Sequence, residues 1–306
     1  MTDLECAFAR ATAFIHAPWW RRFLDQPTTF MFCAALQRLP RCMPLALQVS
    51  THTFFGDEMR VVLPEESACQ IFCYGVIEED VTSFLLTYLT EGMTFIDVGA
   101  NLGYFSLLAA QLVQPSGRVH AFEPARQTCD ILRHNTRRHH HITVQQQALW
   151  SSRTTLPFHE YGQRYAALNS VRKHRLIQEG NLAPKQSYDV ECVSLDEYCT
   201  AFDVAPDFIK IDAETAEPQI LRGGRHTLAR YRPIIVLEVW DDDARNSRDD
   251  IVFLLNHGYA AFEYHASAII PHHLRERYEY TNLLFIHPRK AQGSRPSLRQ
   301  HPRPVA

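Results

Sequence analysis

Two carboxylates stand out because each one interrupts or follows a short apolar run. Asp97 lies in residues 94–105, TFIDVGANLGYF, where an apolar run breaks into glycines and a helix-forming stretch follows. Glu123 follows the run RVHAF, roughly 20 residues beyond those glycines, the distance at which an acidic residue meets ribose hydroxyls. An apolar strand, a tight turn and a helix form the first unit of nucleotide-binding α/β sheets. The sequence therefore predicts a site for a nucleotide or a nucleoside cofactor.

The spacing of the glycines separates the candidate cofactors. A dinucleotide site requires G-x-G-x-x-G, because glycines let the backbone and a helix N-terminus approach a pyrophosphate. This chain instead has D-x-G-x-N-x-G, formed by Asp97, Gly99, Asn101 and Gly103. The carboxylate of Asp97 would repel a pyrophosphate, but it could pair with the ammonium group of an amino-acid moiety, directly or through water. The pattern favours S-adenosylmethionine.

Glu123 indicates an adenosine-type ribose without choosing between cofactors, because NAD and S-adenosylmethionine both carry a free ribose diol. Each carboxylate also has an ordinary structural interpretation. Asp97 could be a turn former, and Glu123 could be an acid at a helix N-terminus. The two residues together at this spacing favour the cofactor site.

A second group of carboxylates follows the apolar run DFIKI. Asp212, Glu214 and Glu217 lie close together in the sequence, and their mutual repulsion costs energy unless something cationic is nearby. A helix N-terminus near Pro218 would accommodate Glu214 and Glu217. It leaves Asp212 unexplained. Glu238 interrupts another apolar run, PIIVLEV, near its carboxyl end, where a charge must be paired or must face a pocket.

Four segments in this order, FIDVGANLGYFSLLAA, VHAFEP, DFIKIDAETAEPQIL and PIIVLEV, resemble the FkbM-type S-adenosylmethionine-dependent methyltransferases. Upstream, residues 74–78 (YGVIE) are similar to the G-x-x-E element that the family places before its first core strand. The resemblance covers residues 55–287. The chain departs from the family pattern D-x-E-G-x-E at Thr215, where glycine is usual.

The resemblance implies that bound S-adenosylmethionine donates a methyl group, most simply to a hydroxyl of a sugar, a polyketide or another small metabolite. The implied cofactor-binding residues are Glu78, Asp97, Gly99, Asn101, Gly103, Glu123 and Ala148. An alcohol needs a base near the methyl group, and Asp212 is the first candidate. Its helpers or metal ligands would be Glu214, Glu217 and Glu238. A carboxylate cluster could hold a divalent cation, but metal-free catalysis is favoured.

Two other functions stay open at this point. A nicotinamide-dependent oxidoreductase would share the strand, turn and helix, but the missing G-x-G-x-x-G opposes it. A scaffold protein that binds the cofactor without catalysis is kept open by Thr215, since the change from glycine could reshape the pocket.

The expected fold class is α/β, a Rossmann-like seven-stranded methyltransferase sheet with helices on both faces. Core strands are expected at residues 94–98, 118–122, 142–146, 207–211 and 233–239, and a terminal hairpin at 259–264 and 282–287. The polar residues 151–193 are expected to form an excursion over the edge of the sheet, where substrate recognition usually lies.

Three regions are expected along the chain. Residues 1–52 would form a small, mainly helical N-terminal extension with helices at 4–14 and 30–39. Residues 53–287 would form the methyltransferase domain, which begins with a β-hairpin at 53–63 that turns at Gly56-Asp57. Residues 288–306 contain five basic residues and no acid, which predicts a disordered basic tail.

Composition narrows the expected partners. The net charge of -3 gives no reason to expect nucleic acid, and 46% hydrophobic residues suffice for a buried core. No apolar run approaches the ~18 residues of a membrane span, and the acidic N-terminus does not resemble a secretory signal. The eight cysteines form no C-x-x-C pair, so reduced thiols in a cytoplasmic protein are expected. A small hydroxylated acceptor is the expected partner, with homo-oligomerisation open. Trp19 and Trp20 could touch a membrane interface, but they are expected to pack onto the domain, which is the commoner arrangement.

Overall fold

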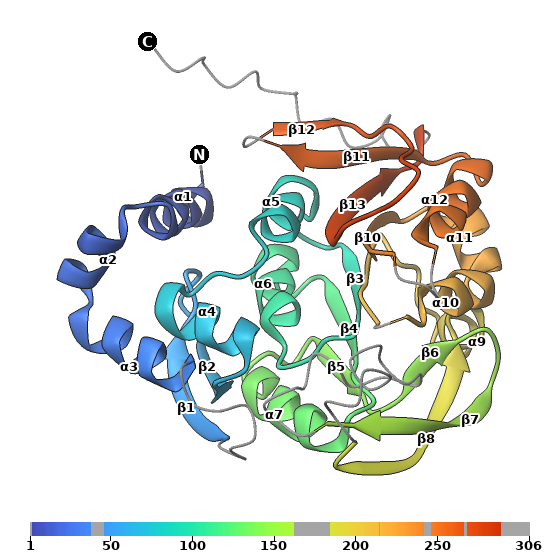
Figure 1. Cartoon of the computed structure of the whole chain (residues 1–306). Helices are drawn as coiled ribbons and strands as arrows, with labels where there is room; N and C mark the ends of the chain where they lie inside the picture. The colour runs from blue at the N-terminus through green and yellow to red at the C-terminus, as the bar shows by residue number, and fades with distance from the viewer. Residues whose placement is uncertain are drawn as a thin grey trace.

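A mixed sheet forms the centre of the molecule (Figure 1), with the strand order β12-β11-β13-β10-β9-β3-β4-β5. The computed structural model describes residues 2–37, 46–161, 184–213, 215–241, 246–265 and 268–288. The strands are β3 (Thr94–Val98), β4 (Arg118–Phe122), β5 (Ile142–Gln145), β9 (Phe208–Ile211), β10 (Ile234–Val239), β11 (Ala260–His265), β12 (Ala268–Pro271) and β13 (Thr281–Ile286). Strands β5, β4, β3, β9 and β10 are parallel, and β13 is antiparallel to β10.

The expected α/β class is confirmed. Each of the seven expected strands has a counterpart, but the sheet has eight strands in the described part of the chain, so the expected count was one too low. The additional strand is β12, a short edge strand that pairs with β11. It arises because the chain turns back on β11 before it returns to the sheet as β13.

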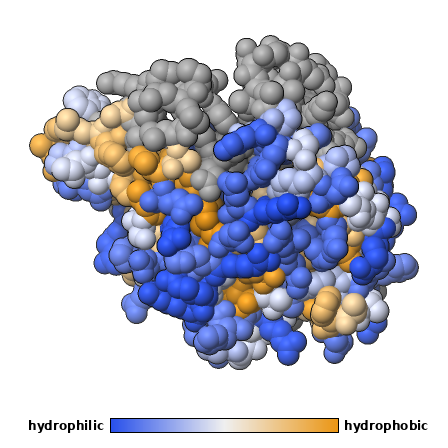
Figure 2. Space-filling model, turned by 90° about the horizontal axis from the view of Figure 1, so that it is seen from below, coloured by the Kyte–Doolittle hydropathy of each residue, from blue (hydrophilic) through white to orange (hydrophobic). Residues whose placement is uncertain are grey.

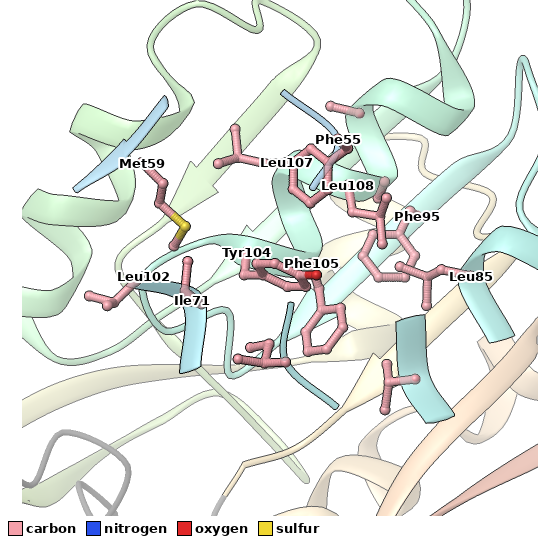
Figure 3. Close-up of a cluster of buried hydrophobic side chains, with 14 of the residues drawn as sticks. Phe55, Met59, Ile71, Leu85, Phe95, Leu102, Tyr104, Phe105, Leu107 and Leu108 are labelled. Atoms are coloured by element: carbon pink, nitrogen blue, oxygen red, sulfur yellow. The ribbon is translucent and has the colours of Figure 1, made fainter. Parts of the chain in front are cut away.

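Helices cover both faces of this sheet. One face carries α4 (Glu66–Tyr74), α5 (Glu79–Tyr88), α6 (Tyr104–Val113) and α7 (Arg126–Thr136), and the other carries α9 (Leu195–Ala201), α10 (Glu217–Gly223), α11 (Arg225–Tyr231) and α12 (Ser247–Asn256). Side chains that alternate along the strands supply both cores. Phe95 (Figure 3) and Phe208 belong to the first core. Their neighbours Ile96 and Ile209 belong to the second. Strands buried on both faces explain why the sequence shows continuous apolar runs.

The polar excursion forms a second, three-stranded sheet. Its strands are β6 (Ala148–Trp150), β7 (Thr154–Glu160) and β8 (Gln186–Ser194), in the order β6-β8-β7. The side chain of Phe158 on β7 joins Ala148 and Val190 in a small apolar core of its own. Residues 162–183, in the middle of the excursion, lie outside the described part of the chain.

The N-terminal region contains α1 (Asp3–Ile15), α2 (Trp19–Asp25) and α3 (Pro27–Gln37), followed by the antiparallel pair β1 (Leu47–His52) and β2 (Glu58–Leu63). One helix more than expected forms because Pro18 precedes α2 and Pro27 begins α3, positions that proline favours. The hairpin was expected at 53–63. Its turn is at Gly56-Asp57 as expected, but its first strand lies earlier, before residue 53.

The N-terminal helices present an apolar surface. Trp19 and Trp20 are 64% and 52% exposed, so the expectation that they pack onto the domain is wrong. Leu24 and Met31 are exposed as well. Figure 2 shows apolar residues at the edge of the molecule formed by these helices, while much of the remaining coloured face is hydrophilic. None of the helices in the described ranges combines the length and apolar character that a membrane crossing requires.

Candidate active site

A cavity of about 540 Å³ lies at the carboxyl ends of the parallel strands, the edge at which doubly wound sheets bind ligands. Its walls come from the ends of β3, β4, β9 and β10, from the beginning of β13 and from β6. The predicted site residues that line it are Glu78, Gly99, Asn101, Glu123, Ala148, Asp212 and Glu238. Residues that lie far apart in the sequence, from Glu78 to Glu238, thus meet in one cavity.

Three predicted site residues lie beneath this surface instead. Asp97 and Glu217 are fully buried, and neither lines the cavity. Gly103 begins α6, where an added Cβ would lie 2.5 Å from Leu132 on α7, so its small size serves helix packing. Glu217 accepts a hydrogen bond from the backbone N–H of Ala213 at 2.9 Å. Glu214 lies outside the described residues.

The turn after β3 is shaped by close backbone approach. A Cβ on Gly99 would lie 1.7 Å from the carbonyl oxygen of Asp212, so only glycine lets the ends of β3 and β9 come together. Asn101 has a φ of 49° and donates its backbone N–H to Oε2 of Glu123 at 3.0 Å. The turn therefore links three neighbouring strand ends at the cavity wall.

Glu123 is held in place by backbone donors. In addition to Asn101, the N–H of Ala125 donates to its Oε1 at 2.8 Å. Burial nevertheless raises the pKa of Glu123 to about 7, because these two hydrogen bonds only partly offset the loss of hydration. The carboxylate lines the cavity with acceptor capacity left on both oxygens. This is the chemistry that a ribose diol requires.

Lys210 lies between the two acidic strand ends. It is opposite Asp97 in the parallel register of β9 and β3. Its Nζ is 2.7 Å from Oδ2 of Asp212 and 4.0 Å from Oδ1 of Asp97, and it lies 5.1 Å from the ring centre of Phe105. The hydroxyl of Ser106 donates to Oδ2 of Asp97 at 2.6 Å. The cation that the acidic cluster needs is therefore part of the chain, and Asp97 contacts it from below the cavity.

The charge of Lys210 is stabilised by its surroundings. Burial by itself would lower the pKa of this lysine, but the charges of Asp212, Asp97 and Glu78 outweigh burial and raise the pKa above its ordinary value. Lys210 thus stays protonated at neutral pH and cannot serve as a base. Lys210 was not predicted as a site residue. A lysine inside the apolar run FIKI is nevertheless a signal, because a charge in a strand buried on both faces must have a partner.

The opposite end of the cavity forms where β10 meets β13. Glu238 pairs with Asn282 in the register of these strands. The amide Nδ2 of Asn282 donates to Oδ2 of Asp80 at 3.1 Å and to Oε2 of Glu78 at 3.4 Å. Glu78, Asp80 and Glu238 form what we call the acidic edge. Asp80 and Asn282 were not predicted, because only the fold brings α5 and β13 together.

Burial changes the acidity of this edge. It is the largest cause that raises the pKa of Glu78, which reaches about 8; Lys210 opposes the rise, while Asp212 and Asp80 add to it. Burial also raises the pKa of Asp80. A cation bound at this edge would favour the ionised carboxylates.

Thr215 adopts a conformation that suits glycine. Its φ is 80°, in the left-handed region that β-branched residues rarely enter. Its hydroxyl is buried and makes no hydrogen bond with the described part of the chain. Threonine therefore occupies a backbone conformation that favours glycine, the residue that the family pattern has at this position.

The cavity has two chemically different ends. Asn101, Glu123 and Ala148 surround one end with a carboxylate, backbone and apolar surface, whereas the acidic edge surrounds the other. Asp212 directly follows β9, which lies between the two sets of strands. Among the described residues, no group of three or more His, Cys, Asp or Glu side chains is arranged to hold a metal ion.

The sequence from Asp97 to Ala261 matches the model of the Methyltransferase FkbM domain, which covers residues 97–261 and more than half of the chain. The chain belongs to the FkbM methyltransferase domain family. The family expected from the sequence is thus confirmed. The FkbM match contains Asn101, Glu123 and Lys210, whereas Glu78 and Asn282 lie outside it.

Solved structures with a similar fold are distant in sequence. A methyltransferase FkbM from Methylobacillus flagellatus is 16% identical, with a TM-score of 0.44, over 72% of this chain and 52% of that one, so the chain spans about half its length. Aeropyrum pernix fibrillarin in complex with natively bound S-adenosyl-L-methionine is 12% identical (TM-score 0.41, 67% of this chain and 73% of that one). A SAM-dependent O-methyltransferase from Thermotoga maritima is 11% identical (TM-score 0.38, 78% and 77%). No curated protein matches the sequence.

Proposed function

We propose that the chain is an S-adenosylmethionine-dependent methyltransferase that acts on a hydroxyl of a small acceptor such as a sugar or a polyketide. The observation that carries this proposal is the single cavity in which Glu123, the Lys210-bound Asp212 and the acidic edge meet. Its volume of about 540 Å³ is in the usual range for a small-molecule site.

The residues around Glu123, at the end of the cavity opposite the acidic edge, fit the cofactor. Glu123 offers acceptors to the ribose hydroxyls, and the turn of Gly99 and Asn101 brings backbone to the cavity surface. Ala148 and Leu149 add apolar surface that suits the adenine. When bound, S-adenosylmethionine supplies the activated methyl group. The chain's own task is to orient the reactants and to take up a proton.

Asp212 is the proposed base. Lys210 holds its Oδ2, and Oδ1 makes no hydrogen bond with the described residues, so it is available to an acceptor hydroxyl. With S-adenosylmethionine bound, the cofactor would supply the methyl carbon to the hydroxyl oxygen and keep the electron pair of the broken carbon–sulfur bond, while Asp212 would take the hydroxyl proton. Lys210 keeps the carboxylate in one orientation during this step.

Calorimetric titration tests the cofactor class. The purified protein is titrated with S-adenosylmethionine, S-adenosylhomocysteine and NAD, with and without magnesium. We expect the first two to bind and NAD not to bind. Binding of NAD alone would contradict the proposal and favour an oxidoreductase, and a gain in affinity with magnesium would assign a metal to the carboxylates.

Two substitutions test the assigned roles. Glu123→Ala should weaken S-adenosylhomocysteine binding by roughly 10- to 100-fold, because a charge-assisted hydrogen bond is lost. Asp212→Asn should spare that affinity while lowering turnover by roughly 10²-fold or more. Unchanged affinity in Glu123→Ala would refute the ribose assignment. Cofactor binding without turnover of any acceptor, in the protein with Asp212 intact, would favour a scaffold.

A further inference from the structure

A second cavity, of about 700 Å³, opens beside the first one. Gln70, Ile77, Glu78 and Asp80 border both cavities, so the two meet at the acidic edge. The remaining walls come from the end of α1, the end of α4, the beginning of α5 and β11. The two cavities are therefore neighbours at the end of the first cavity that lies opposite Glu123.

The N-terminal extension supplies part of this wall. Ile15 and His16 at the end of α1 line the second cavity, and α1 is fixed there by contacts of its own. Phe14 packs edge-on against Tyr74, with ring centres 6.1 Å apart, and His16 Nε2 lies 3.0 Å from Glu79. These residues lie outside the FkbM match, so the wall is supplied by the N-terminal extension and not by the matched domain.

The charges of the second cavity favour a cationic ligand. Glu78, Glu79 and Asp80 line it, and the only basic side chain among its described lining residues is His16, which already contacts Glu79. Asp80 has neutral partners, the amide of Asn282 and the backbone N–H of Val81. Carboxylates with neutral partners gain most from an incoming ammonium group.

Aromatic rings add to this preference. Tyr74 and Tyr264 line the second cavity, and Tyr280, which is 59% exposed, lines the first one near the acidic edge. The face of an aromatic ring attracts a cation at a partly exposed site, and this attraction adds to that of the carboxylates. A sugar without a charge would use neither feature fully.

We propose that the second cavity binds the methyl acceptor, and that this acceptor carries a protonated amine that pairs with Asp80 and Glu78. This assigns Glu78 to the acceptor, whereas the family resemblance implied that it binds the cofactor. The inference rests on the proposed function, because it names the class of acceptor for the same reaction. The hydroxyl to be methylated then points toward Asp212, while the amine and the rest of the molecule extend along α1 and α5.

Matched pairs of acceptors test the charge. Glucosamine, 2-deoxystreptamine and neamine, each beside its fully N-acetylated form, are titrated at pH 7 into the protein saturated with S-adenosylhomocysteine. Acetylation keeps the hydroxyls and removes the positive charge. At least one free amine should bind at least tenfold more tightly than its acetylated partner. Amine binding should also release protons, seen as an enthalpy that depends on the buffer, because Glu78 becomes ionised.

Variants test the location. Asp80→Asn should weaken amine binding at least fivefold, and Ile15→Trp, which fills the second cavity from α1, should do the same. Exposed positions provide the controls: Glu91→Gln removes a remote carboxylate, and Ala9→Trp adds the same ring elsewhere on α1. Neither control should change amine binding, and S-adenosylhomocysteine affinity should be equal in all four variants.

Each other outcome overturns the inference in a distinct way. Equal binding of acetylated forms would reject the cationic class. An affinity for the amine that is unchanged in Asp80→Asn and in Ile15→Trp would place the amine binding site elsewhere. Binding of S-adenosylhomocysteine but of no amine would reject the acceptor class and leave the proposed function standing. Failure to bind S-adenosylhomocysteine itself would reject the proposed function, and with it this inference.

Discussion

The carboxylates at the ends of β3 and β9 share one buried cation. Lys210 is nearly inaccessible and contacts both Asp97, on β3, and Asp212, which directly follows the neighbouring strand β9. A buried charge is costly unless paired, and removal of one partner leaves the others without compensation. Lys210 therefore links stability to the geometry of the proposed base.

Lys210→Met should lower the free energy of unfolding by about 3–5 kcal/mol, because Asp97 would be left as an uncompensated buried charge. Urea unfolding at pH 7 measures the change. Combining it with Asp97→Asn should recover part of the loss, since the orphaned charge is then removed too. A loss below roughly 1 kcal/mol in the single variant would mean that the pair is not coupled as the distances indicate.

Replacing Thr215 by glycine should stabilise the protein, whereas Lys210→Met should destabilise it. Thr215→Gly should raise the free energy of unfolding by about 1 kcal/mol, because glycine adopts a φ of 80° without strain. Thr215→Ala is the matched control, and it should gain less, since alanine keeps a Cβ in the same region. Thermal unfolding should show the glycine variant melting roughly 2–4 °C higher. An equal gain in both variants would assign the effect to the threonine side chain instead.

Pairs of elements, rather than single residues, create the acidic edge. The register of β10 and β13 sets Glu238 opposite Asn282, and the amide of Asn282 reaches the beginning of α5. Glu78 precedes α5 with a φ of 43°, which turns the chain into the helix. The edge thus depends on a strand near the C-terminus and a helix before the first core strand.

Stability should depend on pH through this edge. The pKa of Glu78 is raised from 4.5 to about 8, so between these values the folded protein binds more protons than the unfolded chain. The free energy of unfolding of the ligand-free protein should therefore fall as pH rises from 5 to 8, by roughly 1 kcal/mol or more from this group. Urea unfolding of Glu78→Gln should show a shallower fall. The exposed control Glu91→Gln should follow the unsubstituted protein, and a parallel fall in Glu78→Gln would contradict the assignment.

At the scale of the whole molecule, the sheet separates two cores that share the same strands. Leu108 on α6 belongs to the first core, and Leu254 on α12 belongs to the second. Both are fully buried, whereas Leu24 on α2 is 68% exposed. The same residue type thus occurs in three environments.

Leu108→Ala and Leu254→Ala should each lower the free energy of unfolding by about 2–5 kcal/mol, because each leaves a cavity in a packed core. Leu24→Ala should change it by less than about 0.5 kcal/mol. Urea unfolding followed by fluorescence and by circular dichroism provides the measurement. A small effect in only one of the buried variants would show that its face of the sheet is not tightly packed.

The local sequence predicted much of the fold and of the cofactor end of the site. Strands buried on both faces produce apolar runs such as PIIVLEV, and the glycine turn after β3 leaves a recognisable spacing, so these elements were found near their observed positions. Glu123 and Asp212 could be placed at the cavity because carboxyl ends of parallel strands share one edge.

Other features depend on contacts between residues far apart in the chain. The pairing of Lys210 with Asp97 follows from strand register, and the exposure of Trp19 follows from the placement of α2. The contact of Asn282 with Asp80 at the acidic edge needs α5 and β13 side by side, about 200 residues apart in sequence. Local apolar patterns determined the strands and the turn, because those depend on neighbouring residues. Only the tertiary structure decided which charges meet, because that depends on how the strands are ordered in the sheet.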